Sequence, residues 1–293
     1  MLAEIAAKVL MFLGTKKGCS AVAVIDVFFD ASEMNGYTSV AGLIFRKKHL
    51  RTFERGWSAM LRKYGLSHFH MTDCNAAQGE FRGWCREKRD ACAREAIDLL
   101  VSYPLKGIAF TIKNQDFDEV ITSEGLMPNA VTLGVWASLF AVRSWADNSD
   151  SEARISYFFE SGDEEQRSVN NLLNSIAEDP VRRSNARYRR HAFVSKISSF
   201  AAQASDILAW HAAKYAPRRE TGERMRGDFN AIVTKLSVSD DYHDRNWLMQ
   251  LLEISRKHAG EDGNRLAQTA FLYNRSNARQ MERKFLEIWT EAR

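Results

Sequence analysis

Three acidic residues stand at places in the sequence where their carboxylates could act together. Asp30 ends the apolar run "VFFD", Glu160 ends the later run "ISYFFE", and Asp206 lies within the alanine-rich segment "AAQASDILAWH". A carboxylate at the end of a buried strand is costly unless a proton or a cation compensates its charge. Oxygen ligands of this kind suit Mg²⁺ or Mn²⁺, and pairs of such ions stabilise phosphodiester displacement. The pattern therefore predicts a divalent-metal site with nuclease chemistry.

The elements that must position these acids follow from hydrophobic periodicity. Val22–Asp30 and Tyr37–Phe45 read as an antiparallel hairpin, because two apolar, β-branched runs flank a polar turn. Strands followed by alternating helices and strands predict an α/β fold, with a mixed β-sheet flanked by helices. Further strands are expected over Leu105–Asn114, Ala153–Ser161 and His191–Phe200, and helices over 6–14, Lys48–Tyr64, Arg86–Ser102, Asn129–Trp145, Glu164–Ala177, Ala201–Tyr215, Asn246–Lys257 and 265–293.

This arrangement would bring the three acids to one rim of the sheet. Strand ends are exposed at the rim, where open α/β sheets place their sites. Asp206 shares its helix face with Ala202, Gln203, Ala209 and Trp210. Small residues on that face let the helix approach a sheet closely, so the Asp206 carboxylate could meet the two strand ends.

Each acid also has an ordinary structural interpretation. Asp30 could cap a turn, and Glu160 could belong to an acidic helix start that favours the helix dipole. Asp206 could pair with an arginine of the basic stretch that surrounds it. Asp26 shares the strand face of Asp30 and competes with it as a ligand. The order of strand Asp, strand Glu and helix Asp supports a joint site more strongly than any one acid does.

The segment "HFHMTD" offers an acid–base group. His68 and His70 are two residues apart, so on an extended segment they point the same way with Phe69 opposite, and Asp73 could orient one imidazole. Such a group could move protons near neutral pH. A satisfied pair of core histidines is the equally weighted alternative.

Positive charge is concentrated in one stretch of the chain. The net charge is +4. Residues 182–226 hold 11 basic and 3 acidic residues, a local charge of +8 that leaves −4 for the remainder. The stretch predicts a phosphate-contacting surface and a nucleic-acid partner, while a solvated arginine-rich loop is the alternative. The arginines expected to bind substrate are Arg182, Arg183, Arg187, Arg189 and Arg190.

Composition also bounds the location. The four cysteines form no CxxC pair, and no secretory leader precedes the apolar run near the start, which predicts reduced thiols and a cytoplasmic protein. No apolar run approaches the roughly 20 residues that cross a membrane, so no membrane partner is expected.

The sequence resembles a bacterial and phage family, the domain of unknown function numbered 3800. The matching pieces are "FFDASE", "FHMTD", "YFFES" and "QASDILAWH", and they cover the chain from about Val22 to Tyr215. The resemblance implies a ribonuclease H-like domain over 20–217, and the remaining residues, 218–293, are expected to form a helical C-terminal extension packed on it.

The resemblance also implies roles for individual residues. Asp30, Glu160 and Asp206 would bind Mg²⁺ or Mn²⁺, with His70 and Asp73 beside them as catalytic groups. Gln203 would support Asp206 or touch substrate. Two departures from the family pattern stand out: Ala31 replaces the acid expected after Asp30, and Glu33 replaces a glycine. Loss of that acid would weaken one metal site.

Two other classes of function are compatible with the sequence. A non-catalytic module of the same fold would bind nucleic acid or a protein, with the altered "DAS" motif marking lost catalysis. A structural or regulatory protein would use the apolar segment Asn246–Ile254 as an oligomer helix, although packing of that helix on the main domain is favoured.

Overall fold

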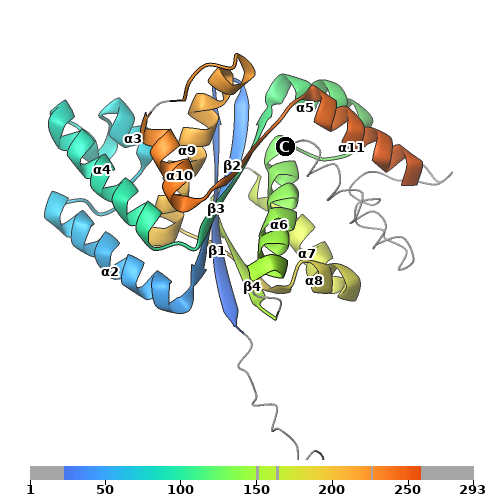
Figure 1. The fold of residues 1–293 in the computed structure, drawn as a ribbon, viewed down its shortest axis with the longest axis horizontal. Helices are drawn as coiled ribbons and strands as arrows, with labels where there is room; N and C mark the ends of the chain where they lie inside the picture. Colours follow the sequence, from blue (N-terminus) through green and yellow to red (C-terminus); the bar gives the residue numbers. More distant parts are fainter. Residues whose placement is uncertain (1–22, 150–151, 163–164, 226, 259–293) are drawn as a thin grey trace, which may run out of the picture.

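The structure, a computed structural model, describes residues 23–149, 152–162, 165–225 and 227–258. These residues form a six-stranded mixed sheet between two layers of helices (Figure 1). The strands are β1 Val24–Met34, β2 Tyr37–Arg46, β3 Lys106–Lys113, β4 Arg154–Glu160, β5 Tyr188–Val194 and β6 Ser239–His243. The predicted α/β class, with a mixed sheet flanked by helices, is confirmed.

The sheet order is β5-β4-β1-β2-β3-β6. Strand β1 pairs antiparallel with β2, and β2 pairs antiparallel with β3. The other pairs, β1 with β4, β4 with β5 and β3 with β6, are parallel. Since β1, β4 and β5 run the same way, their carboxyl ends lie at one edge of the sheet.

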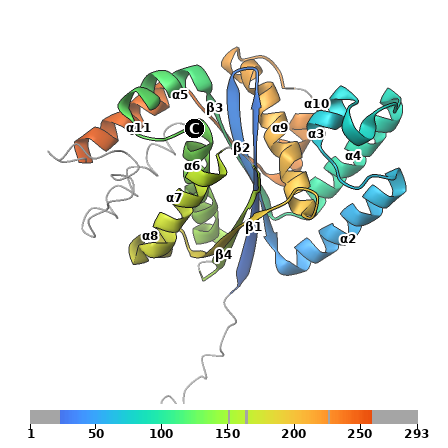
Figure 2. The ribbon, with the colours of Figure 1, turned by 180° about the vertical axis from the view of Figure 1, so that it is seen from behind.

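Helices cover both faces of the sheet (Figures 1 and 2). One face carries α2 Lys47–Tyr64, α3 Met71–Ala76, α4 Arg86–Ser102, α9 Phe200–Glu220 and α10 Gly227–Leu236. The other carries α5 Asn114–Val120, α6 Ala130–Ser149, α7 Gln166–Glu178, α8 Pro180–Asn185 and α11 Arg245–His258. Each layer has its own apolar core, because alternate residues of the strands point to opposite faces.

Helix α9 is the element that lies closest to the centre of the sheet. Its alanines are buried against β1 and β2, and Ser205 Oγ donates a hydrogen bond to the Phe28 carbonyl at 2.7 Å. Ser199 caps the start of the helix by accepting from the Ala202 N–H. The helix continues through Pro217 to Glu220, beyond the predicted end at Tyr215, because a proline near the helix end removes only one backbone hydrogen bond.

Several elements differ from the sequence prediction. The segment from Met71 forms helix α3 and not an extended piece. The predicted strand over His191–Phe200 ends at Val194, and a turn follows. Residues 218–293 are not wholly helical, since Ser239–His243 form β6, a short polar edge strand without an alternating apolar signal. The expected helices over 6–14 and 265–293 lie outside the described residues.

None of the helices in the described ranges combines the length and the apolar character needed to span a bilayer.

His243 closes the core between β6 and α11. Its ring stacks on Phe110 at a centroid distance of 4.5 Å and lies 4.1 Å from the Trp247 ring centroid. The side chain is almost fully buried, and burial lowers the pKa of His243 to about 3. A histidine in the unfolded chain takes up its proton near pH 6.5. The unfolded state therefore binds more protons between these pH values, and stability falls as the pH drops through this window.

We expect His243→Phe to flatten the acid limb of the stability profile. Urea unfolding measures the free energy of unfolding at each pH. Between pH 4 and pH 6.5, its slope against pH should decrease by up to about 1.4 kcal/mol per pH unit in this variant. His49→Phe, which alters an exposed histidine, is the control and should leave the slope as in the unaltered protein. A His243→Phe variant with the original slope would show that His243 does not govern acid stability.

Candidate carboxylate site

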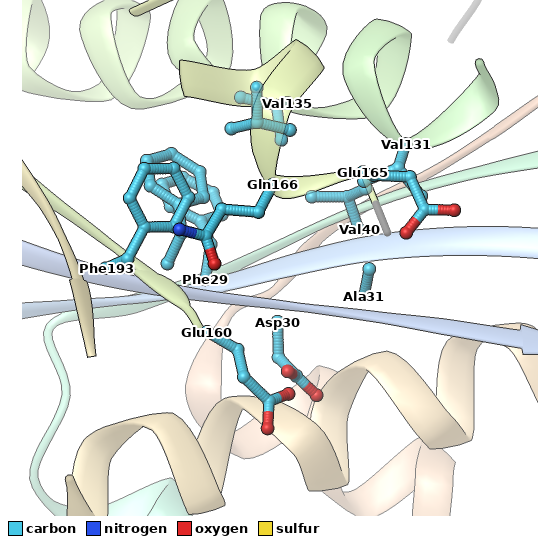
Figure 3. A pocket seen from close by; sticks show the side chains of 12 residues that line it. Phe29, Asp30, Ala31, Val40, Val131, Val135, Glu160, Glu165, Gln166 and Phe193 are labelled. Atoms are coloured by element: carbon cyan, nitrogen blue, oxygen red, sulfur yellow. The ribbon is translucent and has the colours of Figure 1, made fainter. Parts of the chain in front are cut away.

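Asp30 and Glu160 lie side by side on neighbouring strands. The parallel register pairs Phe29 of β1 with Phe159 of β4, so the next residue of each strand is the acid. Figure 3 shows the two carboxylates pointing together, away from Phe29, Val135 and Phe193 on the other side of the sheet. Both acids therefore face the layer that contains α9.

Asp206 reaches the same place from α9. It is only 4% exposed, and its Oδ2 accepts a hydrogen bond from the Met71 N–H at 2.7 Å. Its Oδ1 lies 3.2 Å from Lys196 Nζ and 3.5 Å from His70 Nε2. The structure thus brings together the three acids that the sequence analysis selected, from two strands and one helix.

A lysine lies at the centre of the three acids. Lys196 Nζ is 2.8 Å from Glu160 Oε2, 3.2 Å from Asp206 Oδ1 and 3.5 Å from Asp30 Oδ2. The lysine lies two residues after the end of β5, in the turn before α9. In the sequence, Lys196 falls in the basic stretch and within the strand predicted over His191–Phe200, and neither feature marks it as part of the site. The carboxyl ends of neighbouring parallel strands lie at the same edge of a sheet. A lysine just past the end of the strand beside β4 could therefore have been predicted to lie near Glu160.

The protonation of the cluster follows from burial and charge. Burial raises the pKa of Asp30 well above its ordinary value; Lys196 opposes this shift, and a hydrogen bond to Glu160 reinforces it. Burial alone would raise the pKa of Glu160, but the hydrogen bond from Asp30 and the charge of Lys196 bring it below its ordinary value. Burial alone would lower the pKa of Lys196, but the three carboxylates outweigh it and raise this pKa. Burial therefore favours the protonated form of Asp30, and the carboxylates favour the charged form of Lys196.

One oxygen of the cluster has no hydrogen bond. Asp30 Oδ1 is buried and has no hydrogen-bond partner, and because the Asp30 side chain has no exposed surface, solvent does not reach this oxygen. An unsatisfied buried carboxylate oxygen is costly, and such atoms are typical of sites that take a ligand or an ion.

His70 is the histidine that lies beside the carboxylates. Its Nδ1 is 3.2 Å from Asp73 Oδ2, and its Nε2 faces Asp206. His70 is about one-third exposed, so solvent reaches it. His68 does not share this environment, contrary to the expectation for an extended segment, because it lies next to Ser67 and Glu80. The pair of histidines is therefore split between two surroundings.

Gln203 braces the site from beneath. Its side chain is fully buried; Oε1 accepts from Trp57 Nε1 at 2.8 Å and from the Phe69 N–H at 3.0 Å. Its Nε2 donates to the Lys196 carbonyl at 2.8 Å. This amide ties α2, the segment before α3 and the Lys196 turn to α9, and so it fixes the backbone that presents Lys196.

Three residues that raised questions in the sequence lie away from the cluster. Ala31 lines a small pocket on the opposite face of the sheet, with Val40 and Val131 (Figure 3), so an acid there would not point at Lys196. Glu33 is exposed and accepts a hydrogen bond from Asn114. Asp26 lies four residues before Asp30, about 13 Å along β1.

The five predicted substrate arginines are not next to the acids. Arg190 pairs in register with Ser156, four residues before Glu160, which is about 13 Å along the strand. Its guanidinium lies over the Phe158 ring, and Arg189 Nη1 is 3.4 Å from Ser156 Oγ. The other three lie at or before the start of β5: Arg182 pairs with Asp179, Arg187 pairs with Asp147, and Arg183 is exposed.

The three carboxylates are suitable ligands for a hard divalent cation, and the Lys196 ammonium lies between them. In the described part of the chain, no group of three or more His, Cys, Asp or Glu side chains has an arrangement that could hold a metal ion as it stands. The carboxylate oxygens are nevertheless the ligand type that Mg²⁺ and Mn²⁺ prefer, and Asp30 Oδ1 lacks a partner. The residues fit such an ion in chemistry, and the Lys196 ammonium is the cation that holds them together.

Comparison with known proteins adds no assignment. No protein-family model matches the chain. Neither a curated protein nor a solved structure matches it. The resemblance to the family numbered 3800 stays a prediction.

We expect Gln203→Leu to destabilise the fold. Leucine keeps the volume but leaves the buried N–H groups of Trp57 and Phe69 without an acceptor, at about 1–3 kcal/mol each. Urea unfolding measures the change. Gln115→Leu, at an exposed helix position, is the control and should change stability by less than about 0.5 kcal/mol. Equal stability of the two variants would rule out the bracing role.

Proposed function

We propose that the protein is a divalent-metal-dependent phosphodiester hydrolase that acts on nucleic acid. The observation that carries the proposal is the convergence of Asp30, Glu160 and Asp206 on one cationic atom, within 3.5 Å of Lys196 Nζ. Buried carboxylates from separate elements gather in this way at cost, and a shared cation offsets that cost. Acids whose pKa values are shifted, as those of Asp30 and Glu160 are, are also common in active sites.

We assign the fold as ribonuclease H-like on the arrangement of its strands. The first three strands are antiparallel neighbours, and β4 and β5 then continue the sheet in parallel beyond β1. The acids of the site come from the first strand, the fourth strand and the helix that follows the fifth. A cytoplasmic location agrees with Cys74, Cys85 and Cys92, which are free thiols among the described residues.

Separate residues would bind the metal, transfer the proton and contact the phosphates. Asp30, Glu160 and Asp206 would hold Mg²⁺ or Mn²⁺. The bound ion would offset the negative charge that develops on a phosphodiester as it is cleaved. His70, oriented by Asp73 and open to solvent, would move a proton at Nε2, on the side that faces Asp206. Arg189 and Arg190, exposed on edge strand β5, would contact phosphates some distance from the scissile bond.

A second function is favoured by one specific observation. Lys196 already gives each of the three acids a positively charged partner, so the same geometry suits a non-catalytic module that binds nucleic acid or a protein. In such a module the lysine is a permanent structural counter-ion. Binding to nucleic acid would then survive chelation of metal and weaken steeply with added salt. The hydrolase requires a bound divalent metal and the binding module does not, so a measurement of metal binding distinguishes the two functions.

We expect Asp30→Asn, Glu160→Gln and Asp206→Asn each to abolish Mn²⁺ binding in calorimetry. Cleavage of labelled single-stranded and duplex DNA and RNA should fall by at least about 100-fold, since outer-shell partners of a metal alone are worth about 10–100-fold. Asp98→Asn, at an exposed position on α4, is the control and should bind and cleave normally. Circular dichroism checks that each variant folds. Full cleavage by Asp30→Asn would refute the proposed mechanism.

A further inference from the structure

Lys196 occupies the position at which the three carboxylates meet. Its Nζ contacts one oxygen of each acid at 2.8 to 3.5 Å, and its side chain is only 13% exposed. We infer that Lys196 is an internal counter-ion that a divalent cation must displace in order to bind, so that this lysine sets the metal affinity of the site. The inference rests on the proposed function in one respect, namely that the acids are the metal ligands.

Displacement follows from space and charge. A Mg²⁺ ion lies about 2.0–2.1 Å from its oxygen ligands. An ion that took oxygens of Glu160 and Asp206 as ligands would compete for the same oxygens that the ammonium contacts at 2.8 and 3.2 Å. The two cations would also repel each other at that separation. The lysine and the divalent ion therefore exclude one another.

Among the three acids, Asp30 makes the weakest contact with Lys196. Lys196 Nζ is 3.5 Å from Asp30 Oδ2, the longest of the three contacts, and Asp30 Oδ1 has no hydrogen bond. A single ammonium offers three donors and one charge, whereas a divalent ion carries two charges and takes up to six oxygen ligands. The cluster is thus only partly compensated by the lysine, which leaves a driving force for exchange.

The turn that carries Lys196 allows the side chain to leave while the backbone stays. Gln203 Nε2 holds the Lys196 carbonyl at 2.8 Å, and the N–H groups of Ser198 and Ser199 donate to the Ser195 carbonyl at 3.0 Å. The next residue, Ile197, is 64% exposed, so the turn lies at the surface. A flexible four-carbon stem can carry the ammonium from the acids to solvent without moving these contacts.

Removal of the charge at residue 196 tests the inference. We expect Lys196→Met to bind Mn²⁺ at least tenfold more tightly than the unaltered chain in calorimetry. In chelator the variant should melt at a lower temperature, because its acids lack a counter-ion, and Mn²⁺ should raise its melting temperature more than that of the unaltered chain. Lys63→Met, which removes an exposed partner of Glu95, is the matched control and should change neither quantity. If Lys196→Met does not fold, Lys196→Gln replaces it and carries the same expectation.

The outcomes separate the inference from the proposed function. If the unaltered chain binds Mn²⁺ and Lys196→Met binds it no more tightly, the inference is overturned and the proposed function stands. If only Lys196→Met binds Mn²⁺, the inference stands and metal-dependent hydrolysis by the unaltered chain falls. If neither binds Mn²⁺, both fall, and Lys196 is a structural counter-ion. Addition of Asp30→Asn to Lys196→Met should abolish the gain, which places the ion at these acids.

Discussion

The burial of the Asp30 carboxylate constrains this part of the fold. Asp30 is 3% exposed, faces a helix layer built of apolar side chains, and needs a compensating proton or cation. Glu160 on the neighbouring strand contributes a hydrogen bond, and the Lys196 ammonium contributes positive charge. Each of these partners requires its own element: β4 in parallel register with β1, and the turn after β5 at the same edge of the sheet. The order and direction of these strands therefore place both partners of Asp30 beside its carboxylate.

The site is also joined to the core beneath it. Gln203 connects Trp57, the Phe69 backbone and the Lys196 backbone through one buried amide. Because Trp57 and Phe69 belong to the apolar core of this layer, the position of Lys196 depends on how α2 and α9 pack. A buried polar network in which each member is bonded fixes one geometry, and here that geometry includes the cation at the centre of the acids.

The sequence was informative where local patterns decide the structure. The strand ends at Asp30 and Glu160 follow from apolar runs that end in an acid, and the small residues around Asp206 predicted a helix that lies close to the sheet. Strand β6 escaped prediction because "SDDYH" is polar and is held in place by its pairing with β3. The role of Lys196 also escaped, since it depends on three elements that are distant in sequence. The arginines share one stretch of sequence, but register along β5 keeps them away from the acids.

The most direct test of metal binding at the three acids is to locate manganese in the protein. A crystal grown or soaked with Mn²⁺ gives an anomalous difference map at the manganese absorption edge. We expect a peak bonded to oxygens of Asp30, Glu160 and Asp206, with the Lys196 ammonium moved away from them. A map without that peak at saturating Mn²⁺, with Lys196 still between the three acids, would contradict this expectation.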